Sequence, residues 1–93
     1  MAREAIQITV DGHVQGVGFR WWVVAQARGL GLDGWVRNRR DGSVEVLAIG
    51  EADDIARLRD ACGRGPPGAS VRSVTVEAAG DDGSTGFEQK ATL

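Results

Sequence analysis

The chain has 93 residues, of which 42% are hydrophobic and 26% are charged, and its formal net charge is −2. This length and balance are typical of one globular domain, residues 1–93, and exclude a disordered or fibrous chain. The acidic balance also argues against a general nucleic-acid binder, because such proteins usually display a basic surface.

The sequence also carries information on the compartment. No apolar run approaches the roughly 18 residues of a membrane-spanning helix, and the N-terminus lacks the apolar core of a signal peptide. Cys62 is the single cysteine, which excludes an internal disulfide and a multi-cysteine metal site and suits a reducing compartment. We therefore predict a cytoplasmic monomer that binds neither a membrane nor nucleic acid.

The first third of the chain predicts a strand, a loop and a helix. Residues 6–10 alternate apolar and polar side chains, as a half-buried strand does. The loop HVQGVGFR follows, and the strand is expected to end near Asp11. From Phe19 to about Leu30 the apolar residues recur with a helical period, so we expect one helix there.

The middle of the chain predicts a hairpin and a second helix. Residues 34–38 and 43–49 have strand composition, and Asp41-Gly42 between them is typical of a tight turn. Residues 52–62 carry apolar side chains three and four positions apart, which indicates a helix with one buried face. Those side chains are Ile55, Leu58 and Cys62.

The last third predicts one strand and leaves a second open. The segment GRGPPGAS ends the second helix because proline cannot continue it, and residues 71–76 are a β-branched strand. Residues 86–93 could form a short edge strand. The order β-α-β-β-α-β predicts an α+β fold of the ferredoxin-like split βαβ type, an antiparallel sheet with two helices on one face. This fold hosts many activities, so function has to be argued from a site.

The loop before the first helix is the candidate site. Gly16 and Gly18 permit unusual backbone angles, so that amide groups there and at the helix N-terminus can converge on an anion. Arg20, in the first helical turn, can place its guanidinium against two phosphate oxygens. The pattern is neither a Walker loop nor G-x-G-x-x-G, and the residues alone leave a purely structural turn as the alternative.

Two motifs in succession resemble the acylphosphatase family. They are HVQGVGFR, residues 13–20, and LGLDGWVRNRRDGSVEV, residues 30–46. The family pattern G-x-V-Q-G-V-x-F-R, L-G-L-x-G-x-V-x-N and D-G-x-V is matched piece by piece, and the resemblance covers essentially the whole chain. It implies an enzyme that hydrolyses the carboxyl-phosphate bond of small-molecule acyl phosphates.

The resemblance also implies roles for residues. Arg20 aligns with the family's phosphate-binding arginine, and Asn38 aligns with the asparagine that positions the attacking water. The loop whose amides cradle the phosphate aligns with Gln15, Gly16, Val17, Gly18 and Phe19. Arg39 stands where members vary, so it could alter substrate range, and the tail from Gly86 matches only loosely.

Acyl phosphate chemistry is consistent with so small a set of residues. The leaving carboxylate has a conjugate acid with a pKa of about 4, so it departs without protonation and needs no general acid. Phosphoryl transfer depends on positioning and on charge stabilisation. We expect no metal and no cofactor, and we hypothesise that a phosphate oxygen of the substrate accepts the proton of the water.

Two other functions are weighed against hydrolysis. An RNA-binding module of this fold would expose aromatic residues on its middle strands, and residues 43–49 contain none. The second is a non-catalytic accessory module of the same fold that binds phosphate or carbamoyl phosphate. Such modules lie in longer chains with cysteine-rich zinc segments, so the sequence favours the independent hydrolase.

For most other notable residues near the two motifs, the sequence indicates a packing or surface role rather than a catalytic one. We expect a solvated His13, and packing roles for Trp22, Trp35 and Cys62. Trp21 could instead touch the acyl group. The cluster Arg37, Arg39 and Arg40 is either a charged strand end or a source of positive field that steers an anion.

Overall fold

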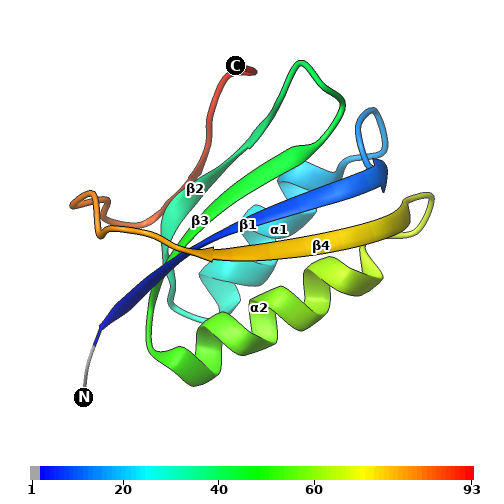
Figure 1. Ribbon diagram of the computed structural model, residues 1–93. Coiled ribbons are helices and arrows are strands. Elements are labelled where there is room, and N and C mark those ends of the chain that lie inside the picture. Colours follow the sequence, from blue (N-terminus) through cyan, green and yellow to red (C-terminus); the bar gives the residue numbers. More distant parts are fainter. Residues whose placement is uncertain (1–2) are drawn as a thin grey trace.

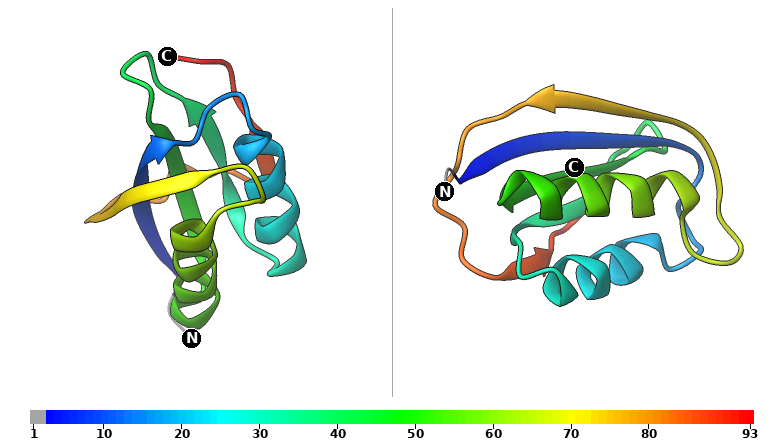
Figure 2. Two further views of the ribbon diagram at one scale, coloured as in Figure 1. Left: turned by 90° about the vertical axis from the view of Figure 1, so that its right-hand side faces the viewer. Right: turned by 90° about the horizontal axis from the view of Figure 1, so that it is seen from below.

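The computed structural model describes residues 3–93, which form one five-stranded sheet and two helices (Figure 1). The sheet order is β4-β1-β3-β2-β5, and both helices cover the same face of it (Figure 2). The predicted ferredoxin-like α+β fold is therefore confirmed, with the fifth strand added. In chain order the elements are β1 (Glu4–His13), α1 (Phe19–Gly29), β2 (Asp33–Asn38), β3 (Val44–Gly50), α2 (Ala52–Arg64), β4 (Ser70–Ala78) and β5 (Phe87–Gln89).

β1 is longer than its sequence pattern predicts. It reaches His13 rather than ending near Asp11, because a β-bulge between Asp11 and Gly12 lets its pairing with β4 continue. Gly12 has a φ of 133°, and a Cβ there would lie 2.2 Å from the carbonyl oxygen of Ser70. Only glycine fits this close approach of two strands, and the bulge directs the chain into the loop before α1.

The second helix also extends past its predicted end. α2 continues to Arg64, two residues beyond Cys62, and Gly65 follows it with a φ of 70°. Asp53 and Asp54 lie in its first turn, where a negative charge is stabilised by the positive end of the helix dipole. No helix within residues 3–93 has the length and apolar composition needed to cross a membrane.

The core lies between the sheet and the two helices. α1 contributes Phe19, Val23 and Ala27, which fall on one face because they follow one another at intervals of four residues. From β1, β2 and β3 the core takes alternate residues, as the period of a strand requires. These strand residues are Ile8, Val10, Val36, Val44, Val46 and Ala48, and α2 adds Ile55, Leu58 and Cys62.

The C-terminal segment forms the edge beside β2. β5 pairs with β2 in parallel, with Val36 opposite Gln89. Backbone hydrogen bonds continue past the strand: the N–H of Lys90 donates to the carbonyl of Val36 at 2.8 Å, and that of Leu93 donates to the carbonyl of Asn38 at 3.1 Å. The edge strand that the sequence left open therefore exists, and its regular part is Phe87–Gln89.

Candidate active site

A pocket of about 130 Å³ lies where the loop before α1 meets the ends of β2 and β5. The loop and the first helical turn supply most of its wall, and each of the two strands supplies its last residue. The lining residues are Val14, Gly16, Gly18, Phe19, Arg20, Trp21, Asn38 and Gln89. Arg20 and Asn38, which come from separate sequence motifs, thus line the same pocket.

The loop owes its shape to two glycines. Gly16 and Gly18 have φ values of 75° and 78°, in the left-handed region that favours glycine. No heavy atom lies within 4 Å of the position that a Cβ would take at either residue. The backbone angle, rather than lack of space, therefore makes glycine suitable, and a side chain there would disfavour the turn that leads into α1.

The N-terminus of α1 offers unpaired donors to the pocket. Gly18 is its N-cap residue, and neither a capping side chain nor an acidic residue is present in the first turn. Within the described chain, the N–H groups of Phe19, Arg20 and Trp21 donate to no backbone acceptor, since the first helical hydrogen bond runs from Trp22 to Gly18. These N–H groups and the helix dipole give the pocket a positive electrostatic character that suits an anion.

Arg20 adds a full positive charge to the same wall. It is the second residue of α1 and is half-buried. No ion pair among residues 3–93 includes it. A guanidinium that no carboxylate neutralises is able to bind two oxygens of a phosphate.

Asn38 faces the pocket from the end of β2. It lies two residues after Val36, and so on the helix-covered side of the sheet. Its Oδ1 atom is buried and has no hydrogen-bond partner within residues 3–93. A buried polar atom without a partner costs about 1–3 kcal/mol of stability, so the residue type at this position is not explained by the fold alone.

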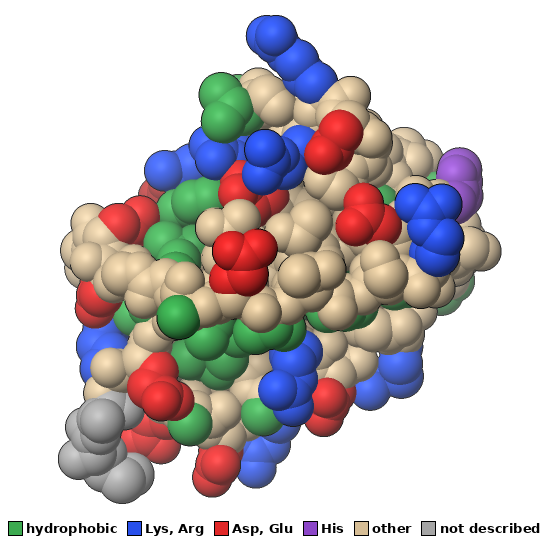
Figure 3. Space-filling view, viewed as in Figure 1, with side chains coloured by type: hydrophobic (Ala, Val, Ile, Leu, Met, Phe, Trp, Pro, Cys, Tyr) green, Lys and Arg blue, Asp and Glu red, His purple; other side chains and the backbone are tan. Residues whose placement is uncertain are grey.

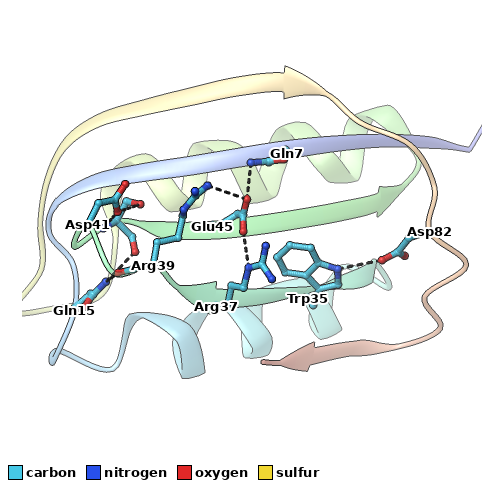
Figure 4. Close-up of polar contacts among 9 residues, drawn as sticks. Gln7, Gln15, Trp35, Arg37, Arg39, Asp41, Glu45 and Asp82 are labelled. Carbon is cyan, nitrogen blue, oxygen red and sulfur yellow. Dashed lines mark hydrogen bonds and ion pairs between the residues drawn. The ribbon is translucent and has the colours of Figure 1, made fainter. Parts of the chain in front are cut away.

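Gln15 connects the loop to the β2–β3 turn. Its Nε2 donates to the carbonyl of Arg39 at 2.7 Å and to that of Ser43 at 2.9 Å (Figure 4). The turn is itself fixed by Asp41, whose Oδ1 accepts from the N–H of Ser43 at 2.9 Å and from its hydroxyl at 2.6 Å. These hydrogen bonds from Ser43 lower the pKa of Asp41 below its ordinary value.

Arg37, within β2, and Arg39, just after it, form ion pairs on the face of the sheet opposite the helices. Glu45 is only 4% exposed there, and it accepts from Arg37 at 2.6 Å, Arg39 at 3.3 Å and Gln7 at 2.7 Å (Figure 4). Neither arginine lines the pocket. Glu45 therefore partly neutralises the field that these side chains were expected to add, and of the residues that line the pocket Arg20 is the only cation.

Several predicted residues lie beside the pocket rather than in its wall. Gln15 and Val17 are not among the lining residues, and Arg40 is exposed on the β2–β3 turn. His13 is exposed and does not line the pocket, as expected for a solvated histidine. Cys62 is fully buried, as predicted.

The tryptophans divide between core and surface. Trp22 packs against the core and lies edge-on to Phe19, with ring centroids 5.5 Å apart. Trp35 lies on the open face of the sheet, where the charged ends of Arg37 and Lys90 stand 4.6 and 5.1 Å from its ring. Trp21 is 72% exposed and lines the pocket.

Two lining residues, Val14 and Gln89, are not predicted by the sequence. Val14 follows β1 and is buried, which a single apolar residue in a loop does not reveal. Gln89 reaches the pocket only because β5 pairs with β2, and the tail carries no pattern that predicts this partner.

Outside the pocket, the surface carries both acidic and basic side chains (Figure 3). On the face shown in Figure 3, acidic and basic side chains are interspersed and form no continuous basic patch. Across residues 3–93, no three His, Cys, Asp or Glu side chains gather in a way that could hold a metal ion. The pocket therefore combines one arginine, backbone donors and uncharged side chains, a set suited to a small anion.

The sequence is similar to known acylphosphatases over most of its length. The family model described as Acylphosphatase matches residues 6–89. A curated protein named Acylphosphatase from Rhizorhabdus wittichii is 52% identical over 91 residues, which are 98% of this chain and 92% of that protein.

Solved structures share the fold over nearly the whole chain. An acylphosphatase from Coxiella burnetii superposes with a TM-score of 0.91 at 40% identity, over 95% of this chain and 93% of that one. Full-length HypF, solved in a phosphate- and nucleotide-bound form, matches with a TM-score of 0.90 at 27% identity. That match covers 98% of this chain but only 12% of HypF, so the same fold also occurs as one part of a much longer protein.

Proposed function

Because the chain belongs to the acylphosphatase family, we propose that its pocket binds the phosphate of an acyl phosphate through Arg20 and the preceding loop, with Asn38 orienting the attacking water. The protein hydrolyses the bond between a carboxyl group and phosphate, giving a carboxylate and inorganic phosphate. The roles of individual residues are our proposal. The observation that carries it is that Arg20, Asn38 and the unpaired N–H groups at the start of α1 border the same pocket.

Arg20 and the backbone N–H groups bind the phosphoryl group. The planar guanidinium donates to two oxygens, while the N–H groups at the start of α1 donate to the others. Charge on these oxygens persists through the transition state of phosphoryl transfer, so donors already in place stabilise it without reorganisation. The left-handed angles at Gly16 and Gly18 direct the backbone into this arrangement.

Asn38 orients the water for in-line attack. Its buried Oδ1 can accept a hydrogen bond from water, but an amide is too weak a base to take up the proton. The water oxygen forms a bond to phosphorus while the bond from phosphorus to the acyl oxygen breaks, and the electron pair leaves with the carboxylate. The proton passes to a phosphate oxygen, because none of the lining side chains is an acid or a histidine.

A non-catalytic phosphate-binding module is the second candidate. It is favoured by the match to a short part of HypF. Curated relatives named Acylphosphatase match over most of their own length, however, and this supports the hydrolase. The cytoplasmic location and the monomeric state remain our predictions from the sequence.

One assay tests the proposed roles. Wild type, Arg20→Ala and Arg72→Ala are compared in the hydrolysis of acetyl phosphate, where Arg72 is an exposed residue of β4 that does not line the pocket. We expect Arg20→Ala to lower kcat/KM by at least about 100-fold, the usual effect of losing one such donor, and Arg72→Ala to match wild type. A folded Arg20→Ala variant with wild-type kcat/KM would remove Arg20 from the mechanism. A wild type that binds phosphate without hydrolysing acetyl phosphate would favour the binding module.

A further inference from the structure

The pocket is small compared with sites that enclose a whole drug-sized ligand. Its volume is about 130 Å³. One water molecule occupies about 30 Å³ in the liquid, and pockets that enclose drug-sized ligands measure about 300–1,000 Å³. If Arg20 holds the phosphate as proposed, the phosphate takes up part of this space, and a bulky acyl group attached to it reaches the rim of the pocket.

The rim carries one large apolar side chain. Trp21 is 72% exposed, and the other large hydrophobic residues exposed within residues 3–93 are Val76 and Leu93. Of these three, only Trp21 lines the pocket. It follows Arg20 directly, so its side chain leaves α1 about 100° around the helix axis from that of the arginine.

The fold does not require a tryptophan at this position. α1 packs on the core through Phe19, Val23 and Ala27, and these residues are at most 2% exposed. Trp21 contributes to none of this packing cluster. Its indole ring instead offers a flat apolar surface beside the phosphate pocket, where an aromatic or aliphatic group can cover it.

Charge at the rim selects against a second anion. The remaining lining side chains are uncharged, and Arg20 is committed to the phosphate in the proposed function. A carboxylate at the far end of the acyl group would find no cation among these residues. An uncharged apolar acyl group would lose contact with water when it covers the ring, which is favourable.

We propose that Trp21 forms an acyl subsite that selects apolar acyl phosphates, above all aromatic ones, by stacking against the acyl group outside the phosphate pocket. The inference rests on the proposed phosphate site at Arg20. It makes Trp21 a specificity-determining residue, since the ring contacts the part of the substrate that differs between acyl phosphates and leaves the reacting atoms to Arg20 and Asn38.

The test compares two substrates that share the reacting bond. We measure kcat/KM for benzoyl phosphate and acetyl phosphate in wild type, Trp21→Ala, Trp21→Phe and the control Val76→Ala. Because Trp21→Ala removes the stacking contact, we expect it to lower kcat/KM for benzoyl phosphate about tenfold. We expect kcat/KM for acetyl phosphate to fall less than about threefold. Trp21→Phe is expected to keep most of the aromatic preference, and Val76→Ala is expected to keep all of it.

A second readout separates binding from chemistry. Benzoylphosphonate and acetylphosphonate retain the phosphorus group but cannot release a carboxylate by the same cleavage. In Trp21→Ala the inhibition constant of benzoylphosphonate is expected to rise about tenfold, with little change for acetylphosphonate. An unchanged ratio of the two substrates and of the two inhibitors would overturn the subsite. Such a result would not contradict the proposed phosphate site. That site would be contradicted only if folded Arg20→Ala kept the wild-type kcat/KM.

Discussion

The side-chain amide nitrogen of Gln15 lies 2.7 Å from the carbonyl oxygen of Arg39, so the loop before α1 is joined to the residue that follows Asn38. The same nitrogen also donates to the carbonyl of Ser43. One side chain thereby sets the distance between the proposed phosphate donors of the loop and the amide that is proposed to orient water. Its own position is outside the pocket wall.

Replacing Gln15 tests this positioning role. Gln15→Met keeps the length of the side chain and removes both donated hydrogen bonds, and each freed carbonyl retains one backbone donor, from Gly42 or from Arg39. We expect a loss of about 1–2 kcal/mol in the free energy of unfolding, measured in urea. We also expect kcat for acetyl phosphate to fall about tenfold or more, because misplacement of the reacting groups is costly.

Comparison of stability with kcat separates a positioning role of Gln15 from a purely stabilising one. Gln15→Asn keeps the amide on a shorter side chain. It therefore tests whether the length of the side chain, as well as its amide group, is needed for the two hydrogen bonds. A Gln15→Met variant that loses stability but keeps the wild-type kcat would show that Gln15 only stabilises the fold.

Replacing Asn38 with an apolar residue is predicted to lower activity without lowering stability. Its Oδ1 is buried without a partner, so replacing the amide with an apolar group of similar shape removes an uncompensated polar atom. We expect Asn38→Leu to unfold at the same or higher urea concentration than wild type, with kcat lowered about 100-fold or more and KM changed far less. Reduced stability together with unchanged kcat would mean that the amide has a structural role.

The sequence predicts the fold well because its hydrophobic period changes clearly between elements. The period of two at residues 6–10 and the helical stripe ending at Cys62 each lead to an element that the structure contains. The ends are less well predicted. The bulge at Gly12 depends on the neighbouring strand β4, and no local pattern encodes contacts between segments so distant in the chain.

The site is predicted only where residues are close in sequence or share a family motif. Gly16, Gly18 and Arg20 follow from one short loop, and Asn38 follows from the second motif. Gln89 could not be found, because its place depends on parallel pairing of a three-residue strand. The role of Glu45 was also hidden, because an acid within an apolar strand does not reveal which arginines it will contact.

The pH dependence of catalysis tests the proposed proton acceptor. Arg20 is the only side chain lining the pocket that carries a charge, and His13 is exposed outside it. We expect kcat to show no ionisation of an enzyme group between about pH 5 and 8, the range in which a histidine base would titrate. His13→Asn should reproduce the wild-type profile, and an inflection that disappears in this variant would identify the histidine as a base.

The thiol of Cys62 makes the stability of the protein sensitive to alkaline pH. Burial raises the pKa of this thiol to about 12, because the core disfavours the thiolate. An unfolded chain ionises its cysteine near pH 8.5, so above that pH it releases a proton that the native state keeps. The contribution of Cys62 to stability is thus fully present below about pH 8.5 and is lost as the pH rises towards 12, by about 1.4 kcal/mol per pH unit once the unfolded thiol is ionised.

Cys62→Ala removes the ionisation and provides the comparison. This variant is destabilised at pH 7 by loss of a buried side chain, but its free energy of unfolding should decline less between pH 8 and 10 than that of wild type. Urea unfolding at both pH values gives the difference, in which the effects of the other titrating groups cancel.

In native wild type at pH 8 a thiol reagent should react with Cys62 only as fast as the protein opens, and quickly in concentrated urea. Equal pH slopes for the two proteins, or rapid labelling of the native thiol, would contradict a buried and protonated Cys62.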